Sequence, residues 1–128
     1  MRRKSDERAL ECAEYFDALI AAFRYVAYRC GYAIATHGSM ARDIDLVCCP
    51  WRDSAVSAAS LIEHLRKVTL EVIGTAAPGR GPQPETKPCG RLGWSFYLTA
   101  GSDRDYGPYL DISVMPKVET KPKKRVRP

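Results

Sequence analysis

The chain has 128 residues, of which 45% are hydrophobic and 27% are charged, an ordinary globular composition at the length of one domain. Two independent domains are therefore excluded, and a chain of this size can bury a sufficient core without disulfides or metals. The formal net charge of +5 lies entirely in residues 117–128, because acidic and basic side chains balance over residues 1–116. We therefore expect a folded domain over 1–116 and a disordered basic tail over 117–128.

The location of the charge and the cysteine pattern limit the kinds of partner and metal site that the chain can have. Only the tail offers sequence-independent attraction to nucleic acid or another polyanion. The five cysteines are an odd number without zinc spacing, so neither a disulfide framework nor a metal knuckle is predicted. No segment has the apolar length of a signal peptide or a membrane helix. We expect a cytoplasmic protein that has no membrane partner.

Two helices are predicted from apolar positions that recur every three or four residues. The first begins near Ser5, has Asp6 in its first turn and ends at Gly31. The second opens at Asp53 or Ser54 and ends at Gly74.

Short β-branched or alternating segments predict strands at residues 32–36, 43–49, 94–99 and 109–114. The last two are joined by a turn-rich segment and should form a hairpin. Residues 74–93 contain seven Pro or Gly between the two flanking glycines, and we interpret them as a long loop that is either a lid or disordered. The expected fold is α+β: a mixed, mainly antiparallel sheet of four or five strands with two long helices on one face.

The most informative segment is residues 36–46, in which a strand is followed by Gly38 and Ser39 and then by a second strand that opens Asp43-Ile44-Asp45. In a strand, residues two apart share a face about 6.5 Å apart, so Asp43 and Asp45 project together. Two such carboxylates repel each other unless a cation lies between them, and magnesium is usually held by one or two carboxylates plus substrate phosphates. The small-residue turn allows backbone N–H groups to approach phosphate. The segment therefore predicts a site for magnesium and a triphosphate.

These residues resemble the nucleotidyltransferase superfamily, which includes DNA polymerase β, minimal nucleotidyltransferases and aminoglycoside nucleotidyltransferases. The resemblance rests on Gly38-Ser39, on Asp43-Ile44-Asp45-Leu46, and on Asp111 in a later hydrophobic strand. It implies that Gly38 and Ser39 bind the triphosphate and that Asp43 and Asp45 bind two magnesium ions. It also implies that Asp111 binds one ion and activates the acceptor hydroxyl. The implied activity is magnesium-dependent transfer of a nucleoside monophosphate from a nucleoside triphosphate, with ATP as the expected donor, and Asp45 and Asp111 as catalytic residues.

One departure from the family pattern supports a second hypothesis. Only Met40, Ala41 and Arg42 separate Gly38-Ser39 from the first aspartate, whereas family members usually have a longer segment there. Arg42 can bind a phosphate or neutralise an aspartate. The alternative function is a catalytically degenerate nucleotidyltransferase fold that binds a nucleotide or a partner protein without turnover. The sequence does not name the acceptor.

Other residues have structural interpretations beside functional ones. Asp-x-Asp pairs are common at solvated strand edges, so the metal site depends on the combined pattern. His37 is interpreted as a turn or packing residue and His64 as an exposed one. The cysteines are interpreted as small buried hydrophobic residues. Trp51 is interpreted as a core or rim aromatic, with base stacking as the alternative.

Overall fold

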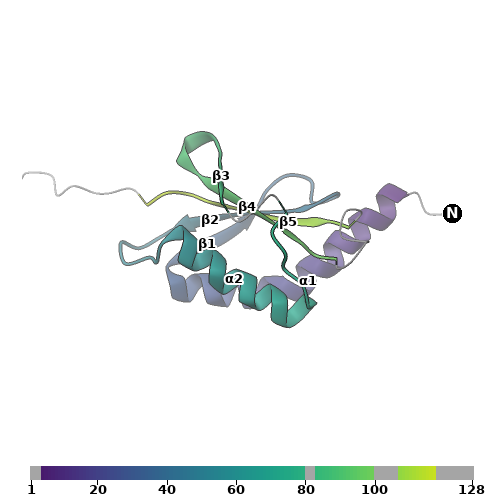
Figure 1. Cartoon of the computed structure of the whole chain (residues 1–128), viewed down its shortest axis with the longest axis horizontal. Coiled ribbons are helices and arrows are strands. Elements are labelled where there is room, and N and C mark those ends of the chain that lie inside the picture. The colour runs from purple at the N-terminus through teal and green to yellow at the C-terminus, as the bar shows by residue number, and fades with distance from the viewer. Residues whose placement is uncertain (1–3, 80–82, 100–106, 118–128) are drawn as a thin grey trace, which may run out of the picture.

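The structure is a computed structural model that describes residues 4–79, 83–99 and 107–117. It has two long helices, a five-stranded sheet and one short 3-10 helix (Figure 1). In chain order these elements are α1 (Lys4–Cys30), β1 (Tyr32–Thr36), β2 (Ile44–Pro50), α2 (Ala58–Ile73), β3 (Glu85–Thr86), η1 (Pro88–Gly90), β4 (Leu92–Tyr97) and β5 (Tyr109–Val114).

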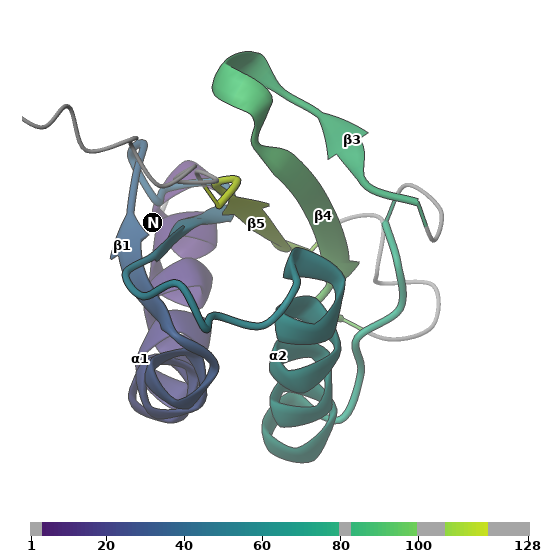
Figure 2. The ribbon, with the colours of Figure 1, turned by 90° about the vertical axis from the view of Figure 1, so that its left-hand side faces the viewer.

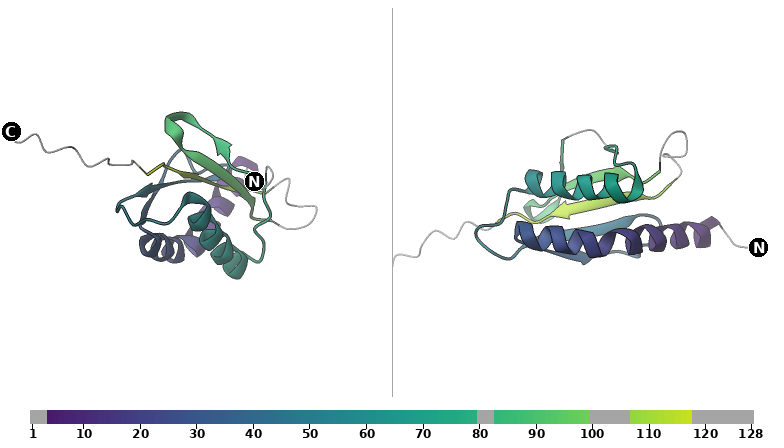
Figure 3. Two further views of the ribbon diagram at one scale, coloured as in Figure 1. Left: turned by 60° about the vertical axis from the view of Figure 1, so that its left-hand side comes forward. Right: turned by 90° about the horizontal axis from the view of Figure 1, so that it is seen from below.

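The strand order across the sheet is β1-β2-β5-β4-β3. The β2–β5 pair is parallel, and the other three pairs are antiparallel. The helices α1 and α2 lie side by side on one face of the sheet (Figures 2 and 3). The α+β fold with a mixed, mainly antiparallel sheet and two helices on one face is therefore confirmed, as is the β4–β5 hairpin.

The core lies between this sheet face and the two helices, because alternate strand residues are apolar. On β2, Ile44 and Leu46 are 1% exposed, and on β5 the same holds for Ile112. They meet helix residues such as Phe23 and Leu65, which are completely buried. Since successive strand residues point to opposite faces, the residues between these apolar positions lie on the face that the helices leave uncovered.

The second helix begins later than the sequence predicts. Its N-cap is Ser57, whose side chain accepts a hydrogen bond from the Ser60 N–H, whereas Asp53 or Ser54 was expected. The preceding residues are held against other elements: Val56 N–H donates to the Cys30 carbonyl at 3.0 Å, and Tyr32 Oη donates to the Val56 carbonyl at 2.7 Å. These contacts with the end of α1 and with β1 keep the chain out of a helix until Ser57.

The segment 74–93 also differs from the predicted loop, because it contains β3, η1 and the start of β4. Its described parts lie along the outer edge of β4: Gly79 N–H donates to the Ser95 carbonyl at 2.7 Å, and β3 pairs with the start of β4. Proline and glycine density did not reveal these pairings, because an edge segment needs only a few backbone hydrogen bonds. Residues 80–82 lie outside the described part of the chain.

Lys117, the first residue of the predicted tail, contacts the folded domain, because its Nζ donates to the Ala55 carbonyl at 2.7 Å. Its remaining residues, 118–128, lie outside the described ranges. Among the described residues, no helix combines the length and the apolar character needed to cross a membrane.

Candidate functional site

A row of polar residues crosses the sheet on the face that the helices leave uncovered. Asp45 on β2 is the register partner of Asp111 on β5, and Asp111 is the partner of Ser95 on β4. His37, just beyond β1, extends the row, because its N–H donates to the Asp45 carbonyl at 3.1 Å. Register partners share a face, and adjacent strands are about 4.8 Å apart. The fold therefore brings together two of the three predicted carboxylates from positions 66 residues apart.

The electrostatics of Asp45 reflect this crowding. Partial burial and then the like charge of Asp111 raise the pKa of Asp45, while the positive potential of His37 acts in the opposite direction. The charges of Asp43 and Lys87 make smaller contributions, Asp43 raising and Lys87 lowering the pKa. An anionic pair of this kind is stabilised by a cation between its members. The donor set of Asp45 and Asp111 thus fits a hard divalent cation.

Asp111 is oriented by a residue that the sequence analysis did not single out. The hydroxyl of Ser95 donates a hydrogen bond to Oδ1 of Asp111. This bond engages one of the two carboxylate oxygens of Asp111. The only signal for Ser95 in the sequence is its place on an alternating strand, and its partner could not be known without the β4–β5 register.

Asp43 has a different environment from the other two aspartates. Its Oδ1 accepts a hydrogen bond from Tyr109 N–H at 2.9 Å and lies 3.5 Å from Nη2 of Arg8. These contacts join the N-terminal ends of β2 and β5 to α1. Within residues 4–79, 83–99 and 107–117, no three His, Cys, Asp or Glu side chains are close enough to hold one metal ion. The structure thus pairs Asp45 with Asp111 and engages Asp43 elsewhere.

The turn that precedes β2 approaches the carboxylate pair through Gly38. The φ of Gly38 is +74°, and a Cβ at this position would lie 3.3 Å from Oδ2 of Asp45. Met40 also has a positive φ, and its sulfur accepts a hydrogen bond from Asp45 N–H at 3.3 Å. The turn is therefore tight, and it places backbone directly beside the Asp45 carboxylate.

The two other predicted nucleotide-binding residues lie on the outside of this turn. Ser39 is exposed, and its hydroxyl oxygen accepts a hydrogen bond from Ala41 N–H at 3.3 Å. Arg42 is exposed as well, and its carbonyl accepts a hydrogen bond from Arg8 Nε at 2.7 Å. In the part of the chain that the structure describes, the ion pair with Asp43 is formed by Arg8 and not by Arg42.

Lys87 is a further site residue that sequence analysis missed. It lies in the turn between β3 and β4, where its N–H donates to the Arg91 carbonyl at 2.9 Å. Its side chain crosses Gly93, where an added Cβ would overlap with Lys87 Cε. Its ammonium charge reaches the site, because it lowers the pKa of Asp45. Gly93 after a Pro-Cys-Gly turn is the only trace of this arrangement in the sequence.

The remaining interpretations can be compared with the structure directly. His37 and His64 are exposed. The cysteines divide into two groups, since Cys12, Cys30 and Cys48 are buried and Cys49 and Cys89 are exposed. The prediction that cysteines are buried hydrophobic residues is therefore confirmed for three of the five.

Comparison with known proteins adds no family assignment: no protein-family model and no curated protein matches the sequence.

Proposed function

We propose that the chain is a magnesium-dependent nucleotidyltransferase that moves a nucleoside monophosphate from a nucleoside triphosphate to an acceptor hydroxyl. The observation that carries this proposal is the side-by-side placement of Asp45 and Asp111 on parallel strands, with the Gly38 backbone at the Asp45 carboxylate. The resemblance of residues 38–46 and Asp111 to the nucleotidyltransferase pattern supports the same activity.

In this proposal Asp45 and Asp111 hold magnesium, which would neutralise charge on the triphosphate and on the leaving pyrophosphate. The backbone at Gly38 gives the phosphates close access to the turn. Arg42, in this turn, and Lys87, in the turn between β3 and β4, supply positive charge. The acceptor oxygen forms a bond to the α-phosphorus while the bond to pyrophosphate breaks. The hydroxyl proton passes to the Asp111 oxygen that Ser95 does not engage.

The two-ion arrangement implied by the family resemblance depends on Asp43. Its Oδ1 is engaged by Tyr109 N–H and Arg8, so Asp43 would have to bind an ion through Oδ2 or be released from Arg8. We therefore assign Asp45 and Asp111 as the primary ligands, and Asp43 as the third ligand when a second ion binds.

The engagement of Asp43, together with the short turn before it, also favours a second candidate function. A chain that retains the carboxylate pair but uses Asp43 as a structural clamp can bind a nucleotide, or a partner protein, without turnover. The variants that test transfer also distinguish the two functions, when nucleotide binding and transfer are measured on each of them.

The decisive experiment compares the wild-type chain with Asp45→Asn and Asp111→Asn, incubated with magnesium, each labelled nucleoside triphosphate and a panel of protein, RNA and small-molecule acceptors. ATP is the first donor to test. Asp17→Asn, which removes an exposed carboxylate from α1, is the matched control. We expect label transfer by the wild type and by Asp17→Asn, and a loss of several kcal/mol of transition-state stabilisation in the other two variants.

Calorimetric titration with a non-hydrolysable triphosphate separates the outcomes. Nucleotide binding that depends on Asp45 and occurs without transfer to any acceptor supports the binding module. The absence of both nucleotide binding and transfer in the wild type contradicts the transferase and the nucleotide-binding module, and leaves only the partner-protein form of the second function.

A further inference from the structure

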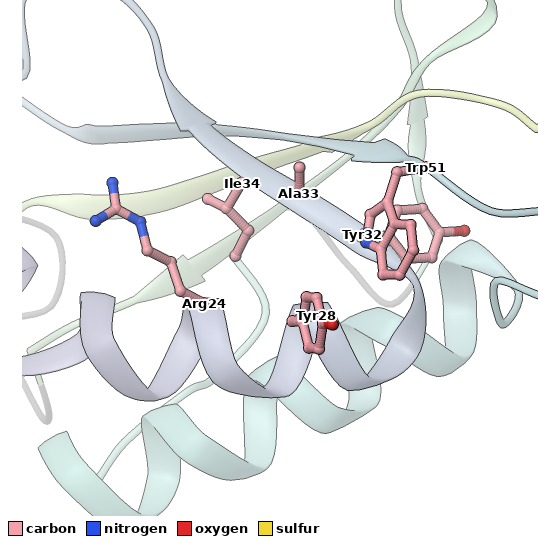
Figure 4. A pocket seen from close by; sticks show the side chains of 6 residues that line it. All are labelled: Arg24, Tyr28, Tyr32, Ala33, Ile34 and Trp51. Carbon is pink, nitrogen blue, oxygen red and sulfur yellow. The ribbon is translucent and has the colours of Figure 1, made fainter.

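A second surface lies away from the carboxylate pair, in a groove between the C-terminal half of α1 and β1 (Figure 4). We call it the α1–β1 groove. Its volume is about 450 Å³, within the range of small-ligand sites. The groove is lined by Arg24, Tyr28, Tyr32, Ala33, Ile34 and Trp51.

The groove contains exposed aromatic rings arranged as a platform. The rings of Tyr28 and Trp51 are stacked, with centroids 5.3 Å apart and planes inclined by 23°. They remain 62% and 48% exposed, so the pair offers apolar ring surface to a ligand. The Arg52 guanidinium lies 5.2 Å from the Trp51 centroid. The platform is therefore preformed and accessible.

The charge around the platform is positive. Arg24 lines the groove, Arg52 lies against the Trp51 ring, and Arg29 follows Tyr28 in the chain. All three are exposed, and they outnumber the exposed acidic residue Asp53 that follows Arg52. Arg52 Nη2 donates to the Arg29 carbonyl at 2.6 Å, which ties the platform to the end of α1. Among the described residues, the ion pairs are those of Arg8 with Asp43 and of Arg66 with Glu63. The three guanidinium charges of this surface are thus left for an anionic ligand.

The backbone of β1 adds hydrogen-bonding groups to the groove. In the described sheet β1 is an edge strand. The backbone hydrogen bonds between the β1 and β2 segments involve odd-numbered residues on the β1 side. Trp51 N–H donates to the Gly31 carbonyl, and His37 N–H donates to the Asp45 carbonyl. Alternation in antiparallel pairs directs the N–H and C=O groups of Tyr32 and Ile34 outward. These groups therefore face away from β2, at the edge of the sheet that borders the groove.

We propose that the α1–β1 groove binds a segment of single-stranded nucleic acid, with a base stacked on the exposed ring of Tyr28 at the end of the Tyr28–Trp51 stack and the backbone phosphates close to Arg24, Arg29 and Arg52. Every base has a face that can stack, and a basic groove beside aromatic rings is the usual design for binding single strands without sequence preference. A neutral peptide strand added to β1 would use the same backbone groups but would bring no negative charge to the three arginines. The charge therefore favours nucleic acid over peptide. The proposal does not depend on transfer activity, because its residues are distinct from the carboxylate pair.

The test uses the full-length chain and two fluorescent probes, an oligothymidylate of about eight nucleotides and an abasic oligomer of the same length and charge. Tyr28→Leu removes the stacking ring and keeps an apolar side chain. Its matched control is Tyr25→Leu, which changes a 65% exposed tyrosine of the same helix outside the groove. Arg24→Gln tests the phosphate contact, with Lys67→Gln on α2 as its control.

We expect Tyr28→Leu to weaken oligothymidylate binding about tenfold and to leave abasic binding unchanged. Arg24→Gln should weaken binding of both probes, and the two controls should bind like the wild type. Thermal melts confirm that all variants are folded. Equal affinity of the wild type for both probes, or wild-type affinity in Tyr28→Leu, would overturn the proposal.

Two further measurements address the other occupants of the groove. Casein, an unfolded protein, is titrated as a peptide probe, and sedimentation equilibrium measures self-association. Tyr28-dependent binding of casein without binding of oligothymidylate would overturn the proposal in favour of a peptide site. A dimer that Tyr28→Leu dissociates would overturn it in favour of a second copy of this chain.

Discussion

Asp45 carries the largest electrostatic cost of the candidate site. Burial and the neighbouring Asp111 raise its pKa, so the folded chain holds the Asp45 proton more tightly than the unfolded chain does. As pH rises through the interval between the ordinary and the raised pKa, the folded state binds more protons than the unfolded state, and stability falls. A neutral side chain at position 45 avoids this loss.

Asp45→Asn should therefore be about as stable as the wild type at acidic pH and more stable at neutral pH without magnesium. Because Asp45 is only partly buried, the gain should be about 1 kcal/mol or less. Urea unfolding over a range of pH measures it, with Asp17→Asn as the control that shows no such trend. A variant that is less stable than the wild type at neutral pH would contradict this account of the carboxylate pair.

Gly38 offers a second test at the scale of a single residue. Gly38→Ala forces a side chain into a positive φ and places its Cβ 3.3 Å from Asp45 Oδ2. Gly74→Ala is the matched control, because Gly74 also has a positive φ, while nothing lies within 4 Å of its added Cβ. Both should cost about 1–2 kcal/mol of unfolding free energy, measured by urea titration. Only Gly38→Ala should also weaken stabilisation by magnesium and nucleotide, and equal ligand responses would show that Gly38 has no role beyond its φ.

At the scale of elements, the Asp43 carboxylate joins β2, β5 and α1 through Tyr109 N–H and Arg8. Asp43→Ala leaves the Tyr109 N–H without this acceptor and should lower the unfolding free energy by about 1.5–3 kcal/mol, the range for hydrogen bonds to charged groups. Arg8→Met keeps the Tyr109 bond and removes the partly exposed ion pair together with the exposed hydrogen bond from Arg8 Nε to the Arg42 carbonyl. Because both contacts are solvent-accessible, it should cost less than about 1 kcal/mol. Urea unfolding without metal compares the two variants. Equal effects would show that the ion pair, rather than the backbone bond, holds these elements together.

The elements that the sequence predicts well are those in which local pattern and tertiary packing agree. The apolar spacing of α1 and the alternation of β2 and β5 match the face that each buries. The start of α2 was misplaced because tertiary hydrogen bonds, from Val56 to Cys30 and from Tyr32 to Val56, override a plausible local cap. The pairing of residues 77–79 and β3 with β4 depends on partners distant in sequence, which no local pattern contains.

In the candidate site, too, local sequence pattern predicts some features, while contacts between residues distant in sequence determine the others. Spacing predicts that Asp43 and Asp45 share a face, whereas in the structure Asp43 precedes β2 and its carboxylate contacts Arg8 of α1 and Tyr109 N–H. The resemblance groups Asp111 with both aspartates, but spacing could not show that Asp45 pairs with Asp111 while Asp43 pairs with Arg8. This division depends on the parallel β2–β5 register and on where α1 places Arg8. The hydroxyl of Ser95 and the ammonium of Lys87 enter the site only through the β4 register and the turn after β3.

At the scale of the whole molecule, positive charge is divided between the folded part and residues 117–128, the basic segment. Residues 117–128 supply the entire net charge of +5, while the arginines of the α1–β1 groove are balanced by acidic residues elsewhere in the chain. Lys117 also has a structural contact, with the Ala55 carbonyl. Binding of duplex DNA should therefore depend on the basic residues beyond Lys117, because duplex DNA offers phosphates but no free base for the aromatic platform.

A full-length variant in which Lys121, Lys123, Lys124, Arg125 and Arg127 are all replaced by Gln tests this division. Each phosphate contact contributes about −0.9 to the slope of log affinity against log salt on duplex DNA, so losing five contacts should flatten the slope by at most about 4.5. The same variant should retain its preference for oligothymidylate over the abasic oligomer, since stacking on Tyr28 is unchanged. Fluorescence titration of each probe at several salt concentrations gives both quantities. An unchanged duplex slope would place the phosphate contacts on the folded domain, and a lost preference for bases would show that the basic segment, not the groove, selects single strands.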